Sequence, residues 1–138
     1  MKQLFDSLRS QWVRATPEEI VRQTWIMRMT QELQFPKELV AVEKELSSLP
    51  DVEPSVPQRR IDILSYMKTN DGIKPLLLIE CKESELKQEA LSQVMSYNYY
   101  IKAPYVAIVN LHQILLAGPQ GERSWLPAYS ELIGGLNG

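Results

Sequence analysis

Two apolar, strand-like segments on either side of a turn signal constrain the fold of this 138-residue chain most strongly. The segments "RRIDILSYMK" (59–68) and "IKPLLLIECK" (73–82) flank "TNDG", in which Asn-Asp-Gly favours a tight turn. The pair predicts a β-hairpin in which the aliphatic run 76–79 leads directly into Glu80 and Lys82. A core strand that ends in Glu-x-Lys either surfaces there or brings charged groups to a site.

Helical and strand patterns on both sides of this hairpin predict an α/β fold. Thr16 and Glu19 form a Thr-x-x-Glu capping box around Pro17, which starts a helix that should run to about residue 34. The remaining expected elements are a strand over 38–46, an exposed proline-rich loop over 49–58, a helix over 84–101, and strands over 104–111 and 112–118. The order αβββαββ predicts a mixed β-sheet flanked by α-helices.

Length and composition are those of one soluble domain spanning residues 1–138. The core is expected over 16–118, with 1–15 as an N-terminal extension or an extra helix. No apolar run approaches the ~20 residues that span a bilayer, and the N-terminus does not resemble a signal peptide, so we expect a cytoplasmic protein without membrane contact.

Cysteine, histidine and net charge exclude several classes of site. One cysteine, Cys81, permits no internal disulfide, and one histidine, His112, excludes a histidine-rich zinc site. The formal net charge of −2 gives no general attraction to nucleic acid. Nucleic-acid binding would therefore depend on a local basic patch or on a bound cation.

Strand alternation predicts a group of charged side chains at the end of the hairpin. Glu80 and Lys82 are two residues apart and should project from the same face. A three-residue loop, with Thr69 opposite Ile73, places Asp62 opposite Glu80, although a proline in the second strand can introduce a bulge. The sequence thus predicts two carboxylates and an amine close together, where each residue alone would be an ordinary surface charge.

Two carboxylates so close repel each other unless a proton or a cation neutralises them. Mg²⁺, or Mn²⁺ in its place, takes hard oxygen ligands and retains several waters. Asp62, Glu80 and the backbone carbonyl of Cys81 are therefore predicted as metal ligands. Lys82 would then orient the attacking water and stabilise charge on a phosphate.

Two further positions are candidates for the same site. On the second helix, Gln93 falls on the apolar stripe between Leu86 and Tyr97, and a buried amide should have a partner, which an active site would provide. Arg59 and Arg60 directly precede the strand of Asp62. They are candidate contacts to DNA phosphates, with ordinary solvated charge as the alternative.

These residues together resemble a known superfamily of nucleases. Asp62, the Glu80-x-Lys82 pair, and Gln93 with Tyr97 one turn later resemble the PD-(D/E)XK pattern. More narrowly, "TPEEIVRQ", "RRIDIL", "LLLIECK" and "LSQVMSYNYYIKAPYVAIVN" are similar to the N-terminal nuclease domain of type I restriction enzyme R subunits, over roughly residues 16–118.

The resemblance implies a restriction-endonuclease-like core and a role for each matching residue. Asp62 and Glu80 would ligate Mg²⁺, Lys82 would be catalytic, and Gln93 would support the site or the DNA. A carboxylate from the first helix commonly joins such a site. Glu19 is our choice for it, with the capping box as its structural alternative.

Three functions remain open at this point. The first is a metal-dependent DNA endonuclease domain, with DNA and other restriction-modification subunits or a second copy of the chain as partners. In the active site of such a domain, Gln23 is the alternative to Glu19. The second is a catalytically silent DNA-binding or assembly module with the same fold, and the third is a nuclease for RNA or branched DNA. The 138 residues contain no phosphate-binding loop, so ATP-driven translocation is not expected of them.

Overall fold

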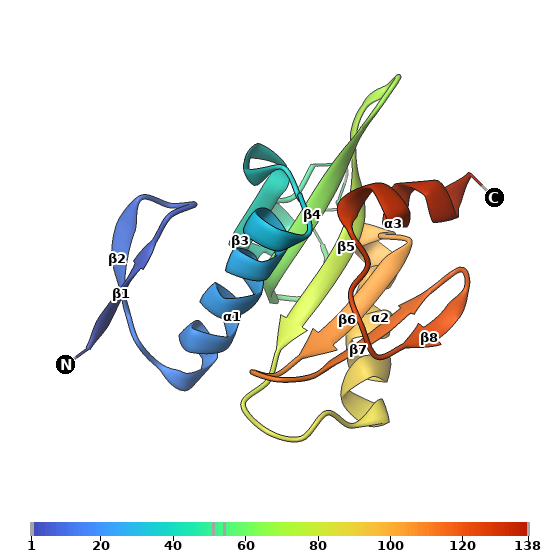
Figure 1. Cartoon of the computed structure of the whole chain (residues 1–138). Helices are drawn as coiled ribbons and strands as arrows, with labels where there is room; N and C mark the ends of the chain where they lie inside the picture. Colours follow the sequence, from blue (N-terminus) through green and yellow to red (C-terminus); the bar gives the residue numbers. More distant parts are fainter. Residues whose placement is uncertain (1, 51, 54, 138) are drawn as a thin grey trace.

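A computed structural model describes residues 2–50, 52–53 and 55–137. It contains a six-stranded sheet in the order β3-β4-β5-β6-β7-β8, in which β5 and β6 run parallel and the other neighbours run antiparallel (Figure 1). The strands are β3 (Val40–Glu45), β4 (Arg60–Thr69), β5 (Gly72–Cys81), β6 (Tyr105–Val109), β7 (Ile114–Gly118) and β8 (Gly121–Arg123). The predicted mixed α/β sheet is confirmed.

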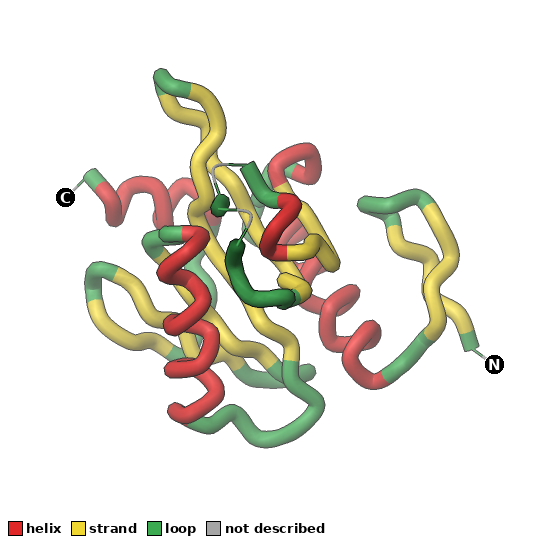
Figure 2. The backbone as a smooth tube through the Cα atoms, turned by 180° about the vertical axis from the view of Figure 1, so that it is seen from behind, coloured by secondary structure: helices red, strands yellow, loops and turns green. Residues whose placement is uncertain are grey.

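Helices cover both faces of the sheet. The helices α1 (Pro17–Met27) and α3 (Tyr129–Leu136) pack with one apolar cluster, whereas α2 (Gln88–Ile101) packs with the other, on the face seen in front in Figure 2. Three short helical turns complete the chain: a π-helical turn η1 (Arg28–Glu32) and the 3₁₀ turns η2 (Lys37–Leu39) and η3 (Leu46–Ser48). Each β-strand of the centre is therefore buried from both sides, which explains the uninterrupted aliphatic run of β5.

The first helix begins as predicted. The Thr16 side chain accepts a hydrogen bond from the backbone N–H of Glu19 at 3.1 Å, and Val21 and Trp25 are buried. Regular α-helical hydrogen bonding ends at Met27 and changes to the π-helical turn, so the prediction of one helix to about residue 34 is wrong in its last part.

The hairpin of β4 and β5 differs from the predicted one at its tip. Thr69 pairs with Gly72, so the loop has two residues instead of three, and Gly72 has a φ of +113° that favours glycine. The ladder then shifts between Ser65 and Tyr66, where Leu76 is an extra residue on β5. This bulge, next to Pro75, adds the residue that the shorter loop lacks.

The bulge restores the predicted register in the half of the hairpin that carries the candidate site. Ile63 pairs with Ile79, so the next position along the ladder sets Asp62 opposite Glu80. The predicted opposition of these two residues is thus obtained with a different turn.

The crossover from β5 to the parallel strand β6 passes through α2. This helix begins at Gln88, four residues later than the predicted Ser84, and ends at Ile101; the next residue, Lys102, is a left-handed C-cap with a φ of +64°. Its buried residues are Leu91, Val94, Tyr97 and Ile101.

Residues 3–14 form an extension, and it is not a helix. The strands β1 (Gln3–Asp6) and β2 (Gln11–Arg14) make a separate two-stranded hairpin beside α1 (Figure 1). Asp6 is fully buried and accepts hydrogen bonds from the backbone N–H groups of Leu8 and Arg9 in its turn. None of the helices among the described residues is long and apolar enough to cross a membrane.

Candidate functional site

Asp62 lies at the start of β4 with both carboxylate oxygens engaged. Oδ1 accepts a hydrogen bond from Nη2 of Arg22 at 2.7 Å, and Oδ2 accepts one from the backbone N–H of Cys81 at 2.8 Å. The Asp62 side chain is buried, with an exposed fraction of 7%. The carboxylate therefore adds one hydrogen bond between β4 and β5 beyond the backbone ladder, and it connects this strand pair to α1 through Arg22.

Asp62→Ala is expected to lower the free energy of unfolding by about 1–3 kcal/mol, because it leaves the buried N–H of Cys81 without an acceptor. Urea denaturation, monitored by tryptophan fluorescence, measures the change. The control is Glu45→Ala, which removes a carboxylate from an exposed pair with Arg60 and should cost less than about 0.5 kcal/mol. Equal stabilities of the Asp62 variant and wild type would contradict the role of the carboxylate in the ladder.

Glu80, at the end of β5, is held from the side of α2. Its carboxylate accepts a hydrogen bond from the hydroxyl of Tyr97 at 2.9 Å and pairs with Arg59 at 3.3 Å. The guanidinium of Arg59 also stacks on the Tyr97 ring, 4.3 Å from its centroid. These contacts fix the rotamer of Glu80, whose side chain is 12% exposed.

The protonation of Glu80 is strongly affected by this setting. Burial, followed by the negative charge of Asp62, raises the pKa of Glu80 to about 7, although the hydrogen bond from Tyr97 and the charge of Arg59 act in the opposite direction. Burial and the neighbouring carboxylate thus outweigh the contacts that stabilise the ionised form of Glu80.

The two carboxylates are neighbours but are held by helices on opposite faces of the sheet, where alternation predicted one shared face. The alternation of side chains along β4 fails at the start of the strand. Ile61 and Leu64 are three residues apart and should face opposite sides, but both pack in the cluster on the α2 side. Glu43, which faces this point on β3, has a φ of +51° and is skipped in the register. Asp62 consequently turns toward α1.

Lys82 continues β5 and borders an open pocket. Its backbone N–H donates to the carbonyl of Val109 at 2.7 Å, and its side chain is half-buried. A surface pocket of about 270 Å³ is lined by Lys82, Gln93 and residues of the intervening loop and helix start. The structure therefore brings Lys82 and Gln93 to the same depression.

Gln93 itself is exposed, so the prediction that it lies on the buried stripe is wrong. The predicted stripe includes Leu86, but Leu86 precedes the helix, which begins at Gln88. Without Leu86 the stripe centres near Val94, and Gln93 falls about 90° away at its edge.

Glu19 and Gln23 belong to an ion-pair network between α1 and the N-terminal hairpin. The buried carboxylate of Glu19 pairs with Arg22 and, at 2.7 Å, with Arg9. The amide of Gln23 donates to Glu19 and Asp6 at 3.0 Å. Among the hydrogen bonds and ion pairs of the described residues, none joins Glu19 or Gln23 to Asp62.

Two residues of α1 that sequence reasoning missed do adjoin Asp62. Glu18 lies beside it, and the Asp62 carboxylate raises the pKa of Glu18. Arg22 bonds it directly. Helical phase could have identified Arg22, since a charged residue that falls between Trp25 and Ile26 on the apolar stripe needs buried partners.

The arginines that precede β4 have different surroundings. Arg59 is engaged by Glu80 and Tyr97, as described above, whereas Arg60 is exposed and forms a loose pair with Glu45 at 3.4 Å. Cys81 is buried and free, and burial raises the pKa of its thiol, so its side chain is a packing group.

The donor set fits a hard divalent cation in its chemistry. Asp62 and Glu80 supply carboxylate oxygens on adjacent strand ends, and their mutual repulsion is the situation that a cation relieves. Among the described residues, no three His, Cys, Asp or Glu side chains are arranged to hold a metal ion. Arg22 and Arg59 supply the positive charge instead.

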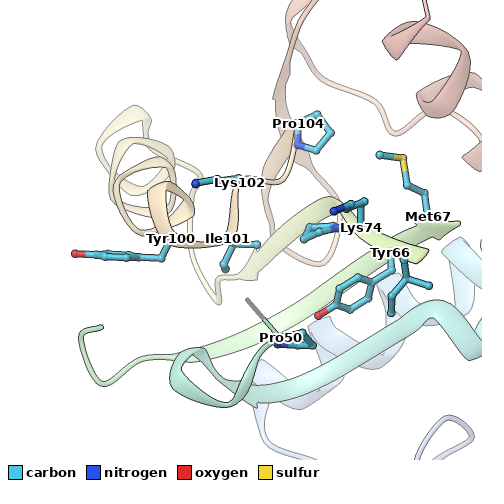
Figure 3. A pocket seen from close by; sticks show the side chains of 10 residues that line it. Pro50, Tyr66, Met67, Lys74, Tyr100, Ile101, Lys102 and Pro104 are labelled. Atoms are coloured by element: carbon cyan, nitrogen blue, oxygen red, sulfur yellow. The ribbon is translucent and has the colours of Figure 1, made fainter. Parts of the chain in front are cut away.

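A second pocket, of about 300 Å³, lies between the tip half of the β4–β5 hairpin and the end of α2 (Figure 3), and its lining includes neither Asp62 nor Glu80. Its lining residues are Pro50, Tyr66, Met67, Ile73, Lys74, Pro75, Tyr100, Ile101, Lys102 and Pro104. These described residues include no carboxylate, so the pocket lacks the groups of the predicted metal site.

Comparisons with known proteins agree with the fold and the resemblance. The family model for the type I restriction enzyme R protein N terminus matches residues 17–124. A solved fragment assigned as an HsdR subunit of a type I restriction enzyme from Vibrio vulnificus YJ016 superposes with a TM-score of 0.59 at 20% identity. The match covers 80% of this chain and 23% of that one, so this chain spans about a quarter of it. No curated protein matches the chain.

Proposed function

Because the chain belongs to the family of type I restriction enzyme R protein N-termini, we propose that it is a metal-dependent DNA endonuclease module that hydrolyses phosphodiester bonds. The observation that carries the proposal is the end of β5, where Glu80 and Lys82 emerge beside the buried carboxylate of Asp62. DNA and other restriction-modification subunits are the proposed partners.

Each residue of the strand end has a defined part in this proposal. Asp62, Glu80 and the carbonyl of Cys81 would hold Mg²⁺ or Mn²⁺, which supplies a Lewis acid that lowers the pKa of water and neutralises phosphate charge. Lys82, at the border of the open pocket, would orient the attacking water and stabilise charge on the phosphate.

DNA would approach across the pocket between the end of β5 and the start of α2. Gln93 is exposed on the wall of this pocket and would bind the phosphate backbone or a base. Arg60 is the exposed arginine near β4 and can reach phosphates, whereas Arg59 is used by Glu80. The net charge of −2 makes these local contacts and the bound cation essential for affinity.

A catalytically silent nuclease-fold module is the second candidate function. It is favoured by the pairing of both carboxylates with arginines, which satisfies their charge without a metal. Calorimetric titration with Mn²⁺ distinguishes the two candidates. A metal-dependent nuclease should give a heat of binding that is lost in Glu80→Ala, whereas the silent module should give no such heat.

Incubation of the wild-type domain with supercoiled plasmid, single-stranded DNA and RNA, with Mg²⁺ or Mn²⁺ and in EDTA, tests the proposed activity. Metal-dependent nicking or linearisation of DNA is the expected result, and the preferred substrate is read from the same gel. Absence of metal-dependent cleavage of either DNA substrate would reject the proposal. Glu80→Ala protein purified in parallel controls for contaminating nuclease.

A further inference from the structure

Arg22 occupies the centre of a group of carboxylates that comes from four parts of the chain. The group consists of Asp6, Glu18, Glu19, Glu43 and Asp62, with Arg9 and Arg22 as its two arginines. Five carboxylates against two guanidinium groups leave an excess of negative charge. Such a group attracts further positive charge.

The contacts of Arg22 are those of a counter-ion. Its Nη2 lies 2.7 Å from Asp62 and 2.8 Å from Glu18, and its Nη1 pairs with Glu19 and lies 3.2 Å from Glu43. The side chain is 2% exposed, so water contributes little to its solvation. The Nε atom is buried and has no hydrogen-bond partner among the described residues.

We propose that Arg22 is an internal counter-ion that competes with a divalent cation for Asp62. The inference rests on the proposed function in one respect, namely that Asp62 is a metal ligand. An ion on Asp62 would lie beside the guanidinium group, and like charges so close in a buried setting repel strongly. A metal ion therefore binds Asp62 only when Arg22 releases this carboxylate. Arg22 then keeps its contacts with the other carboxylates of the group.

This competition has a measurable consequence for affinity. When a binding-competent arrangement is only partly populated, the apparent Kd rises in inverse proportion to that population. Removal of the guanidinium group of Arg22 should lower the Kd for Mn²⁺ by about tenfold or more, if Asp62 is released less than a tenth of the time.

The chain offers a matched control in Arg9. Arg9 belongs to the same group and pairs with Asp6, Glu19 and Glu43, but it contacts neither Asp62 nor Glu18. Arg9→Gln and Arg22→Gln therefore make the same change of net charge in the same group, and they differ in whether Asp62 loses its arginine.

The test uses Mn²⁺ alone, with calorimetry and thermal unfolding in EDTA and in Mn²⁺. Arg22→Gln is expected to melt below wild type in EDTA, to regain stability in Mn²⁺, and to bind Mn²⁺ about tenfold more tightly than wild type and Arg9→Gln. Asp62→Asn in the Arg22→Gln background should remove the gain. An equal gain in both arginine variants, or no gain in Arg22→Gln, overturns the proposal.

If Arg22→Gln does not fold, Arg22→Lys replaces it. A single ammonium cannot bridge Asp62 and Glu43 as the forked guanidinium does, so about a threefold tighter Kd for Mn²⁺ is expected, and an unchanged Kd overturns the proposal. Wild-type DNA cleavage with an unchanged Kd in the arginine variants rejects the counter-ion role and leaves the proposed function intact. If Arg22→Gln binds Mn²⁺ more tightly but wild type does not cleave DNA, the counter-ion role is supported and the proposed function is rejected.

Discussion

Lys82→Ala should lower the single-turnover rate of metal-dependent DNA cleavage by about 10²–10⁴-fold, because in the proposed mechanism the transition state would lose its ammonium group at the phosphate. The fold should be unaffected, since the Lys82 side chain makes no ion pair or hydrogen bond to the described residues. Quenched-flow cleavage of a labelled duplex measures the rate, and thermal unfolding should place the melting temperature within about 2 °C of wild type.

Lys87→Ala is the matched control for this experiment. Lys87 lines the same pocket as Lys82 and is exposed, and its variant loses the same charge. It is the N-cap residue of α2, however, six residues after the end of β5. Its variant should cleave DNA at close to the wild-type rate. A Lys82 variant as active as the Lys87 variant would remove Lys82 from the mechanism.

Glu80→Gln should raise the free energy of unfolding by about 3 kcal/mol above pH 8 and have little effect near pH 4. Burial and the charge of Asp62 raise the pKa of Glu80 from its usual 4.5 to about 7 in the folded state. A carboxyl group with a raised pKa favours folding while it is protonated, so this contribution is complete below about pH 4.5 and is lost as the pH rises through 7. Glutamine remains neutral and avoids that loss.

Urea denaturation of both proteins between pH 4 and pH 8.5 measures this difference. Glu45→Gln is the control, because Glu45 is an exposed partner of Arg60 and its replacement should leave the curve unchanged. Parallel pH profiles for wild type and Glu80→Gln would show that Glu80 ionises normally. If the profiles diverge as expected, the domain retains a carboxylate that destabilises it at neutral pH, as an active site often does.

The central hairpin and its charged end could be predicted because local patterns determine them. The turn signal before Gly72 and the aliphatic run into Glu80 indicate two paired strands, and pairing brings Asp62 to Glu80. The bulge at Leu76 depends on where Pro75 falls in the ladder, which the local pattern does not specify. The predicted pairing of Asp62 with Glu80 is therefore correct, but the predicted three-residue turn is wrong.

The ends of the domain were harder to predict for a different reason. The strands β1 and β2 have four residues each, and their aromatic pair, Phe5 and Trp12, is exposed, so no buried stripe marks them. Similarly, β8 has three residues and α3 has eight, two of them glycine. Tertiary packing, such as the ring contact of Phe35 with Tyr129, stabilises these short elements.

Within the site, the positions of charged groups were predictable but their partners were not. Alternation and register bring Asp62 near Glu80, whereas the arginines that neutralise them come from α1 and from the loop before β4. These contacts depend on how α1 crosses the sheet, which no local pattern specifies.

The extra residue at Leu76 also separates the hairpin into two halves whose strands pair in different registers. The tip beyond it pairs in its own register, and Asn70 and Asp71 at the turn are exposed. A change of loop length there should be absorbed at the irregular ladder position before it reaches Asp62. A peptide tag inserted between Asn70 and Asp71 should therefore leave the pairing of β4 and β5 around Asp62 and Glu80 unchanged.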